Sequence, residues 1–165
     1  MSQTIFSDAK AHFIYQIANA HIREYPFPHA YISSLFPDQF YETLQNQMIA
    51  SSDYKNILET NRVKGNKFKE RFLFEINTNE INNLKPERRK FWTNFCELLN
   101  SQDIGGILIK KFGVYYRTRF GDQLEKEILY PDIMLIRDKL NYNLGPHTDH
   151  PTRTLAFLMY LPKTD

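Results

Sequence analysis

Three stretches of the first hundred residues place apolar side chains at the three- and four-residue spacing of an α-helix. The first follows Ser7, which we expect to cap the helix, and ends before the prolines at positions 26 and 28. The second opens at Pro37, and the third opens at Pro86 and is expected to stop at Gly105 and Gly106. The three apolar faces are formed by Phe13, Ile14, Ile17 and Ala18, by Phe40, Tyr41, Leu44 and Met48, and by Phe91, Trp92, Phe95, Leu98 and Leu99.

Shorter apolar runs, separated by Gly, Pro and Asp, predict β-strands. The predicted strands are 29–32, 72–76, 107–109, 114–116, 133–136 and 154–161. Thr154–Leu161 is apolar at both sets of alternating positions, which predicts a central strand covered on both faces. The pattern predicts an α+β fold in a single domain, 1–165, with a helical region and short strands in 1–105 and mainly strands in 106–165.

The composition narrows the class of protein. Of the 165 residues, 42% are hydrophobic, which suffices for a packed core, yet no apolar stretch approaches the roughly 18 residues of a membrane-spanning helix. Cys96 is the only cysteine, so an internal disulfide is excluded, and its place on an apolar helix stripe predicts an inert buried thiol. The N-terminus lacks the basic start and apolar core of a signal peptide, so we expect a cytoplasmic protein without membrane contact.

A basic and aromatic segment at 110–120 is the main alternative source of function. Lys110, Lys111, Arg117 and Arg119 alternate there with aromatic residues, a pattern that suits stacking and phosphate contact with single-stranded nucleic acid. A strand with one buried aromatic face explains the same pattern. Because 21 Lys and Arg against 19 Asp and Glu give a net charge of only +2, we do not expect nucleic acid as a partner.

The most specific candidate for chemistry is Gly145-Pro146-His147-Thr148-Asp149-His150-Pro151. In an extended segment, side chains two positions apart project to the same side, so His147 and Asp149 can converge on one ion. They would supply two members of the 2-His-1-carboxylate triad that binds ferrous iron and leaves three coordination positions open. The alternative is a solvated turn, in which Asp149 caps backbone donors and His147 packs against proline.

The sequence around this motif resembles a known family. Residues 142–162, with a tyrosine before His-x-Asp and a following apolar run that ends in Tyr160-Leu161-Pro162, resemble the first metal-ligand segment of the iron(II)/2-oxoglutarate-dependent dioxygenases. The prolyl-hydroxylase-like branch is the most similar. Residues 25–32, followed by a helix that opens at Pro37-Asp38, are similar to the amino-terminal support region of such proteins.

The resemblance implies a double-stranded β-helix, or jelly-roll, with 106–165 as its first part and the preceding helices packed on its outer face. It implies Fe(II) as cofactor and 2-oxoglutarate as co-substrate, whose decarboxylation is coupled to hydroxylation of an unidentified substrate. His147 and Asp149 match iron ligands, and Tyr160 matches a tyrosine that holds the far carboxylate of 2-oxoglutarate. A core aromatic remains the alternative for Tyr160.

Three further residues near the motif receive weaker assignments. Arg153 lies where relatives often contact substrate, although a plain surface arginine accounts for it as well. Arg137 departs in residue type from the co-substrate contact that relatives carry about ten positions before the motif, and His150 falls outside the family pattern. We therefore expect His150 at the rim of the site and assign no role to Arg137.

The family pattern breaks after Asp149. The distal histidine and the basic residue that pairs with 2-oxoglutarate follow several strands later in the family, whereas this chain ends at Asp165. The sequence is therefore expected to be the front portion of a longer oxygenase. The alternative is a non-catalytic binding or structural relative of the same fold.

Overall fold

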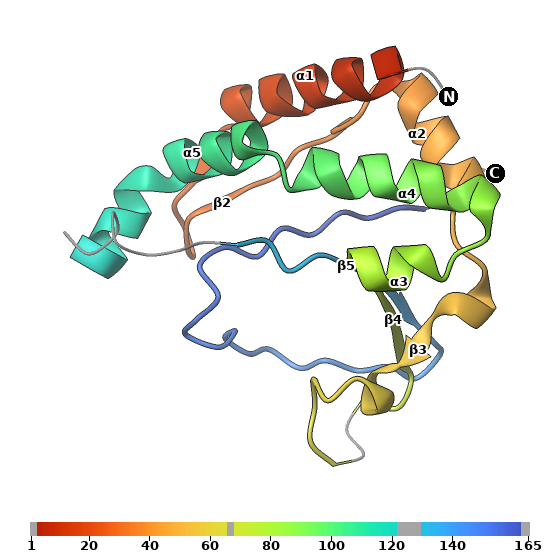
Figure 1. Ribbon diagram of the computed structural model, residues 1–165. Coiled ribbons are helices and arrows are strands. Elements are labelled where there is room, and N and C mark those ends of the chain that lie inside the picture. The colour runs from red at the N-terminus through yellow and green to blue at the C-terminus, as the bar shows by residue number, and fades with distance from the viewer. Residues whose placement is uncertain (1–2, 66–67, 122–129, 163–165) are drawn as a thin grey trace. The chain divides into compact units, whose positions relative to one another are not determined.

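A computed structural model describes residues 3–65, 68–121 and 130–162, which form helices and small antiparallel sheets (Figure 1). The chain divides into two compact units. Unit 1 comprises Met1–Gln47 and Thr93–Pro131, and unit 2 comprises Met48–Trp92 and Asp132–Asp165. The predicted combination of helices and β-sheet is confirmed, and the described strands close no barrel. No helix within the described ranges has both the length and the apolarity to cross a membrane.

Unit 1 is mainly helical. It contains α1 (Gln3–Asn19), α2 (Asp38–Asn46), the end of α4 (Pro86–Leu99) and α5 (Gln102–Phe120), with β1 (Ile22–Arg23) pairing antiparallel to β2 (His29–Ala30). Its buried residues are Phe6, Ala9, Phe13, Ile17, Phe36, Phe40, Leu44, Phe95, Leu98, Ile104 and Tyr116. The helix predictions that rested on Phe13, Ile17, Phe40 and Leu44 are therefore confirmed, and the predicted strand at 29–32 is present in part.

The ends of two helices differ from the prediction. Ser7 lies inside α1, which already begins at Gln3, so it does not cap the helix. Gly105 and Gly106 lie inside α5 and do not stop α4, because Ser101 starts the new helix by accepting from the Ile104 amide. Each interior glycine costs about 1 kcal/mol relative to alanine, and the packing of α5 on α1 offsets that cost.

The prediction of strands at 107–109 and 114–116 is wrong, because both runs belong to α5. Two polar contacts hold this helix to α1: Lys10 pairs with Asp103, and Lys111 Nζ donates to the Ala18 carbonyl at 2.7 Å. Within the two short apolar runs, only Tyr116 is buried, while Ile109 and Val114 are exposed on the helix. The predicted boundary between the helical region 1–105 and the strand region 106–165 therefore falls inside α5.

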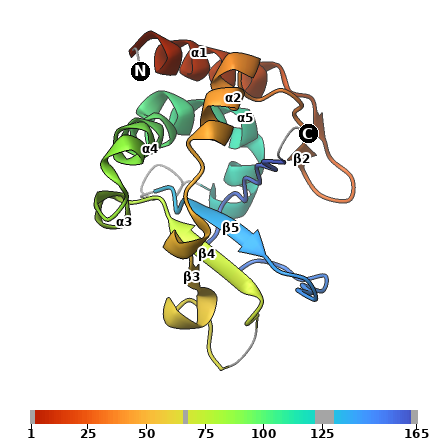
Figure 2. The same cartoon turned by 90° about the vertical axis from the view of Figure 1, so that its right-hand side faces the viewer.

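Unit 2 contains a three-stranded antiparallel sheet in the order β3-β4-β5 (Figure 2). The strands are β3 (Lys55–Asn56), β4 (Arg71–Glu75) and β5 (Met134–Asp138), and the predictions at 72–76 and 133–136 are confirmed to within two residues at each end. Two short 3₁₀ turns, η1 (Ser51–Asp53) and η2 (Ile57–Glu59), flank β3, and α3 (Thr78–Asn82) follows β4. The buried residues of the unit are Ile49, Ile57, Leu73, Phe74, Ile76, Ile81, Leu84, Phe91, Trp92 and Leu135.

The predicted central strand at Thr154–Leu161 is wrong. This run belongs to no strand of the described sheets, and Leu158 and Tyr160 are 74% and 82% exposed. An apolar run becomes a covered strand only where a neighbouring strand accepts its backbone hydrogen bonds. In the described part of the chain the sheet order is β3-β4-β5, and the run pairs with none of these strands.

Candidate metal site

The loop that carries His147 and Asp149 leaves β5 through an anchored turn. Arg71 on β4 donates from Nε and Nη2 to the two carboxylate oxygens of Asp138, each at 2.8 Å, and its guanidinium lies 4.2 Å from the centre of the Tyr142 ring. The Tyr142 amide donates to the Lys139 carbonyl at 3.1 Å, which closes the turn. Burial of the hydroxyl raises the pKa of Tyr142. The start of the loop is thereby fixed to the sheet.

The structure brings His147 and Asp149 together. His147 Nε2 lies 3.5 Å from Asp149 Oδ1, and the two side chains are 48% and 42% exposed. His147 Nδ1 lies 2.9 Å from the Gly145 carbonyl oxygen, which can only accept, so Nδ1 carries the proton. In the neutral ring the Nε2 lone pair therefore faces a carboxylate oxygen, an arrangement that a cation between them stabilises.

The spacing of the two atoms suits a shared ion. Ligands at adjacent positions of an octahedral ion, with bonds of about 2.1 Å, lie about 3.0 Å apart, and in a tetrahedral ion they lie about 3.4 Å apart. The separation of 3.5 Å between His147 Nε2 and Asp149 Oδ1 is slightly larger than both. The two atoms thus lie at nearly the separation of two ligands that share one divalent ion. The two side chains therefore lie close together, and their binding of a common ion stays a prediction.

His150 is held away from this pair by a turn of its own. Its Nδ1 lies 3.3 Å from the Thr152 backbone nitrogen and 2.9 Å from Thr152 Oγ1. A backbone N–H can only donate, so this Nδ1 accepts and the proton resides on Nε2, opposite to the arrangement in His147. The Arg153 amide closes the turn by donating to the His150 carbonyl at 2.8 Å.

The described residues fit the predicted ferrous site only in part. His147 and Asp149 provide one nitrogen and one oxygen ligand, a donor set that suits iron. Within the described ranges, however, no group of three or more His, Cys, Asp or Glu side chains could hold a metal ion. The third ligand of the triad is therefore not supplied by the described residues.

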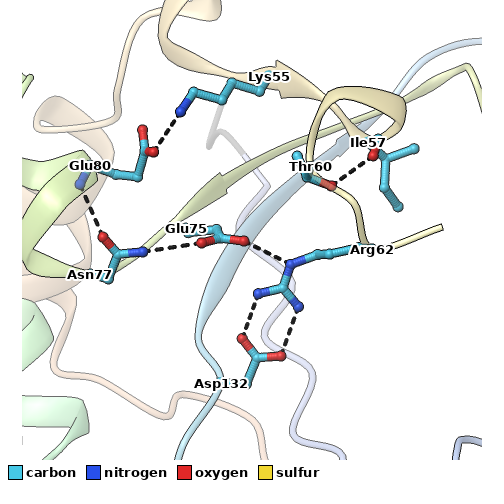
Figure 3. Close-up of polar contacts among 8 residues, drawn as sticks. All are labelled: Lys55, Ile57, Thr60, Arg62, Glu75, Asn77, Glu80 and Asp132. Carbon is cyan, nitrogen blue, oxygen red and sulfur yellow. Dashed lines mark hydrogen bonds and ion pairs between the residues drawn. The ribbon is translucent and has the colours of Figure 1, made fainter.

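Arg153 lies near a charge cluster of unit 2 that the sequence did not predict. Arg62 donates from Nη1 and Nη2 to the two carboxylate oxygens of Asp132 and from Nε to Glu75, each at 2.8 Å (Figure 3). The hydrogen bonds from Arg62 hold the pKa of Asp132 below its usual value, and the positive charge of Arg153 lowers it further. Arg62 and Asp132 lie 70 positions apart, and no sequence spacing could have indicated the pair.

Figure 3 shows that the same cluster continues toward α3. Asn77 donates from Nδ2 to Glu75 at 3.1 Å and accepts from the Glu80 amide at 3.0 Å, and Lys55 pairs with Glu80 at 2.5 Å. The pKa of the Arg62 guanidinium is raised by its bond to Asp132, so this residue stays charged at any ordinary pH. The network joins the segment before β4, β4 itself, α3 and the entry to β5.

The surroundings of the remaining candidate residues differ. Tyr160 is 82% exposed, so the alternative of a core aromatic is wrong, while its contact with 2-oxoglutarate stays a prediction. Arg137 donates from Nη1 to Ser51 Oγ beside the sheet. Cys96 is half-buried, and burial raises the pKa of its thiol, which disfavours the reactive thiolate.

The chain was compared with protein-family models, with curated proteins and with solved structures, and none of the three comparisons finds a match.

The basic residues of the nucleic-acid alternative lie on α5, not on a strand as the sequence pattern suggested. Lys111 caps α1 through the Ala18 carbonyl, whereas Lys110 and Arg117 are exposed.

Proposed function

We propose that this chain is part of an Fe(II)/2-oxoglutarate-dependent dioxygenase, a hydroxylase, and that His147 and Asp149 are two of its metal ligands. The observation that carries the proposal is the 3.5 Å approach of His147 Nε2 to Asp149 Oδ1, with His147 Nδ1 bound to the Gly145 carbonyl. Metal-binding histidines commonly donate their second ring nitrogen to a carbonyl in this way, which fixes the ring and directs the other nitrogen to the metal.

The surroundings of the pair support a catalytic rather than a structural ion. Both side chains are about half exposed, so an ion held by them keeps coordination positions open to a co-substrate. The carboxylate of Asp149 offsets one of the two positive charges of the metal, and His147 contributes a neutral donor. The iron, when bound, supplies oxygen activation coupled to the decarboxylation of 2-oxoglutarate.

In this proposal the other residues either position the loop or bind the co-substrate and the substrate. The Arg71–Asp138 pair and the Tyr142 ring hold the start of the loop on the sheet. Tyr160 is proposed to bind the far carboxylate of 2-oxoglutarate, and Arg153 to contact the hydroxylation substrate. The proposal includes a jelly-roll core, to which β5 would belong, and a cytoplasmic location.

Metal binding and turnover test the proposal separately. Mn(II) is titrated anaerobically into the full chain in the presence of 2-oxoglutarate and followed by the loss of the free-ion electron paramagnetic resonance signal. We expect His147→Ala and Asp149→Ala each to weaken binding by about tenfold or more. His150→Ala is the matched control, because His150 is an exposed histidine of the same loop that lies outside the pair, and it should bind Mn(II) like the unsubstituted chain.

In this proposal the chain alone is expected to be inactive, because the described residues supply only two of the three iron ligands. Turnover is therefore measured on the complete protein that contains this sequence, as succinate formed from 2-oxoglutarate with Fe(II) and oxygen. Succinate formation that disappears in both His147→Ala and Asp149→Ala supports the oxygenase. Undiminished turnover in either variant would end the assignment of iron ligands. Mn(II) binding that depends on both residues, together with no succinate from the complete protein, would overturn the oxygenase and assign a non-catalytic metal-binding relative.

A further inference from the structure

A second candidate binding site lies in unit 1, where the chain runs back beside the end of α1 after the β1–β2 hairpin (Figure 1). A hollow of about 250 Å³ is lined there by Gln16, Asn19, His21, Tyr31, Ile32 and Ser33. The hydrogen bond of 2.9 Å between His12 Nε2 and the Ser34 carbonyl holds the returning segment against the helix. One wall is therefore the last turns of α1, and the other is the segment after β2.

The polar groups around the hollow are largely available to a ligand. The side chains of His21, Tyr31 and Ser33 have no hydrogen-bond partner among the residues that the structure describes. Asn19 uses only its nitrogen, which donates to the Tyr15 carbonyl at 2.8 Å, and one polar atom of the Gln16 amide contacts His12 at 3.1 Å. With its free polar atoms, and after rotation about its side-chain bonds, each of these side chains can both donate and accept hydrogen bonds.

The charge around the hollow selects the class of ligand. None of its lining residues is an acid, a lysine or an arginine, so neither an anion nor a cation finds a partner of opposite charge. The hollow adjoins the C-terminal end of α1, where the helix dipole is negative and disfavours phosphate or carboxylate. Lys111, the nearby cation, is engaged with the Ala18 carbonyl at 2.7 Å. A neutral ligand rich in hydroxyl groups satisfies these conditions.

Tyr31 adds a face for such a ligand. Its side chain is 81% exposed at the edge of the hollow, so one ring face can pack on the apolar C–H face of a sugar ring while its hydroxyl contacts a sugar hydroxyl. We propose that this hollow binds a neutral carbohydrate, with one pyranose ring against Tyr31 and its hydroxyl groups bonded to Asn19, Gln16, His21 and Ser33. The site is independent of the metal loop and of the proposed oxygenase activity.

Saturation-transfer nuclear magnetic resonance on the full chain tests this site. The probes are glucose, galactose, mannose, N-acetylglucosamine, maltose and lactose, each titrated to about 50 mM. We expect saturable binding of at least one probe, weakened about tenfold by Tyr31→Ala and also by Asn19→Ala, and largely kept by Tyr31→Phe, which retains the ring. Tyr25→Ala is the matched control, because Tyr25 is a 90% exposed tyrosine of the same unit that does not line the hollow.

Three results would overturn the proposal. The first is no saturable binding of any of these sugars, and the second is an equal loss in Tyr31→Ala and Tyr25→Ala. The third is tighter binding of glucose 6-phosphate than of glucose, because the negative helix end should oppose the phosphate. Circular dichroism of each variant confirms that the fold is kept, and Tyr31→Phe separates loss of the ring from a change in folding.

Discussion

The interior of unit 1 and the sheet of unit 2 are stabilised in different ways. In unit 1, Phe40 lies among other aromatic rings, with ring centres 4.9 Å from Phe36, 5.3 Å from Phe6 and 6.1 Å from Phe95. In unit 2, apolar side chains cover one part of the sheet, while pairs such as Arg71–Asp138 and Arg62–Asp132 join its strands at partly exposed positions. A buried aromatic side chain contributes several times more stability than a partly exposed ion pair.

The loop that carries His147 and Asp149 belongs to neither kind of region. After Leu135, no residue that the structure describes is buried, so the loop is held by its own turns and by the anchor at Tyr142. Surface substitutions of this kind usually change stability by less than about 0.5 kcal/mol. Changes at His147 and Asp149 therefore test the proposed metal binding with little effect on stability, whereas changes in the other two regions report on folding.

The largest effect is expected at the centre of unit 1. Phe40 is 1% exposed, and Phe40→Ala removes its ring from contact with three others. We expect the free energy of unfolding to fall by about 3–5 kcal/mol. Urea denaturation followed by circular dichroism measures the change, and Tyr25→Ala, at a 90% exposed aromatic, should stay within about 0.5 kcal/mol of the unsubstituted chain. A loss below about 1 kcal/mol would contradict an aromatic core.

A smaller loss is expected for the ion pair between β4 and β5. Arg71→Ala removes two charge-assisted hydrogen bonds to Asp138 and the cation–π contact with Tyr142, and we expect a loss of about 1–2 kcal/mol. A double-mutant cycle with Asp138→Ala should give a coupling of about 1 kcal/mol. Lys69→Ala is the control, because its 3.9 Å pair with Glu70 is weak and its side chain is 71% exposed. Zero coupling would show that the pair does not stabilise the sheet.

Much of the local structure was predictable because its signals lie within a few residues. Proline at a helix start placed α2 and α4 correctly, and aromatic β-formers placed β4. The wrong prediction of a helix stop and of strands within α5 has a physical cause. Two adjacent glycines are a strong helix-stop signal, yet Ser101 provided a cap, and the contact with α1 outweighed the cost of the glycines.

The candidate site shows the same division between local and distant signals. The approach of His147 to Asp149 follows from an i, i+2 spacing, so the sequence predicted it. Arg62 and Asp132 meet only because β4 and β5 pair, and nothing in either residue's neighbourhood indicates the other. The strand prediction for Thr154–Leu161 failed for a related reason. An apolar run does not specify which neighbouring strand will accept its backbone hydrogen bonds.

The smallest predicted effect concerns the acid stability of unit 2. Arg62 lowers the pKa of Asp132, so the folded state binds fewer protons than the unfolded state, in which an aspartate titrates near about 3.9. The stabilisation is present above that unfolded value and is lost as the pH falls through the lower folded value. We expect Asp132→Asn to lower the free energy of unfolding at pH 7 and to lower it less at pH 3. The difference between the two pH values should be under about 1 kcal/mol, because the side chain is 43% exposed. Urea midpoints of both chains at the two pH values measure this, with Asp8→Asn, an exposed change on α1, as control. An equal cost at both pH values would show that the Arg62–Asp132 bond does not contribute through the charge of the carboxylate.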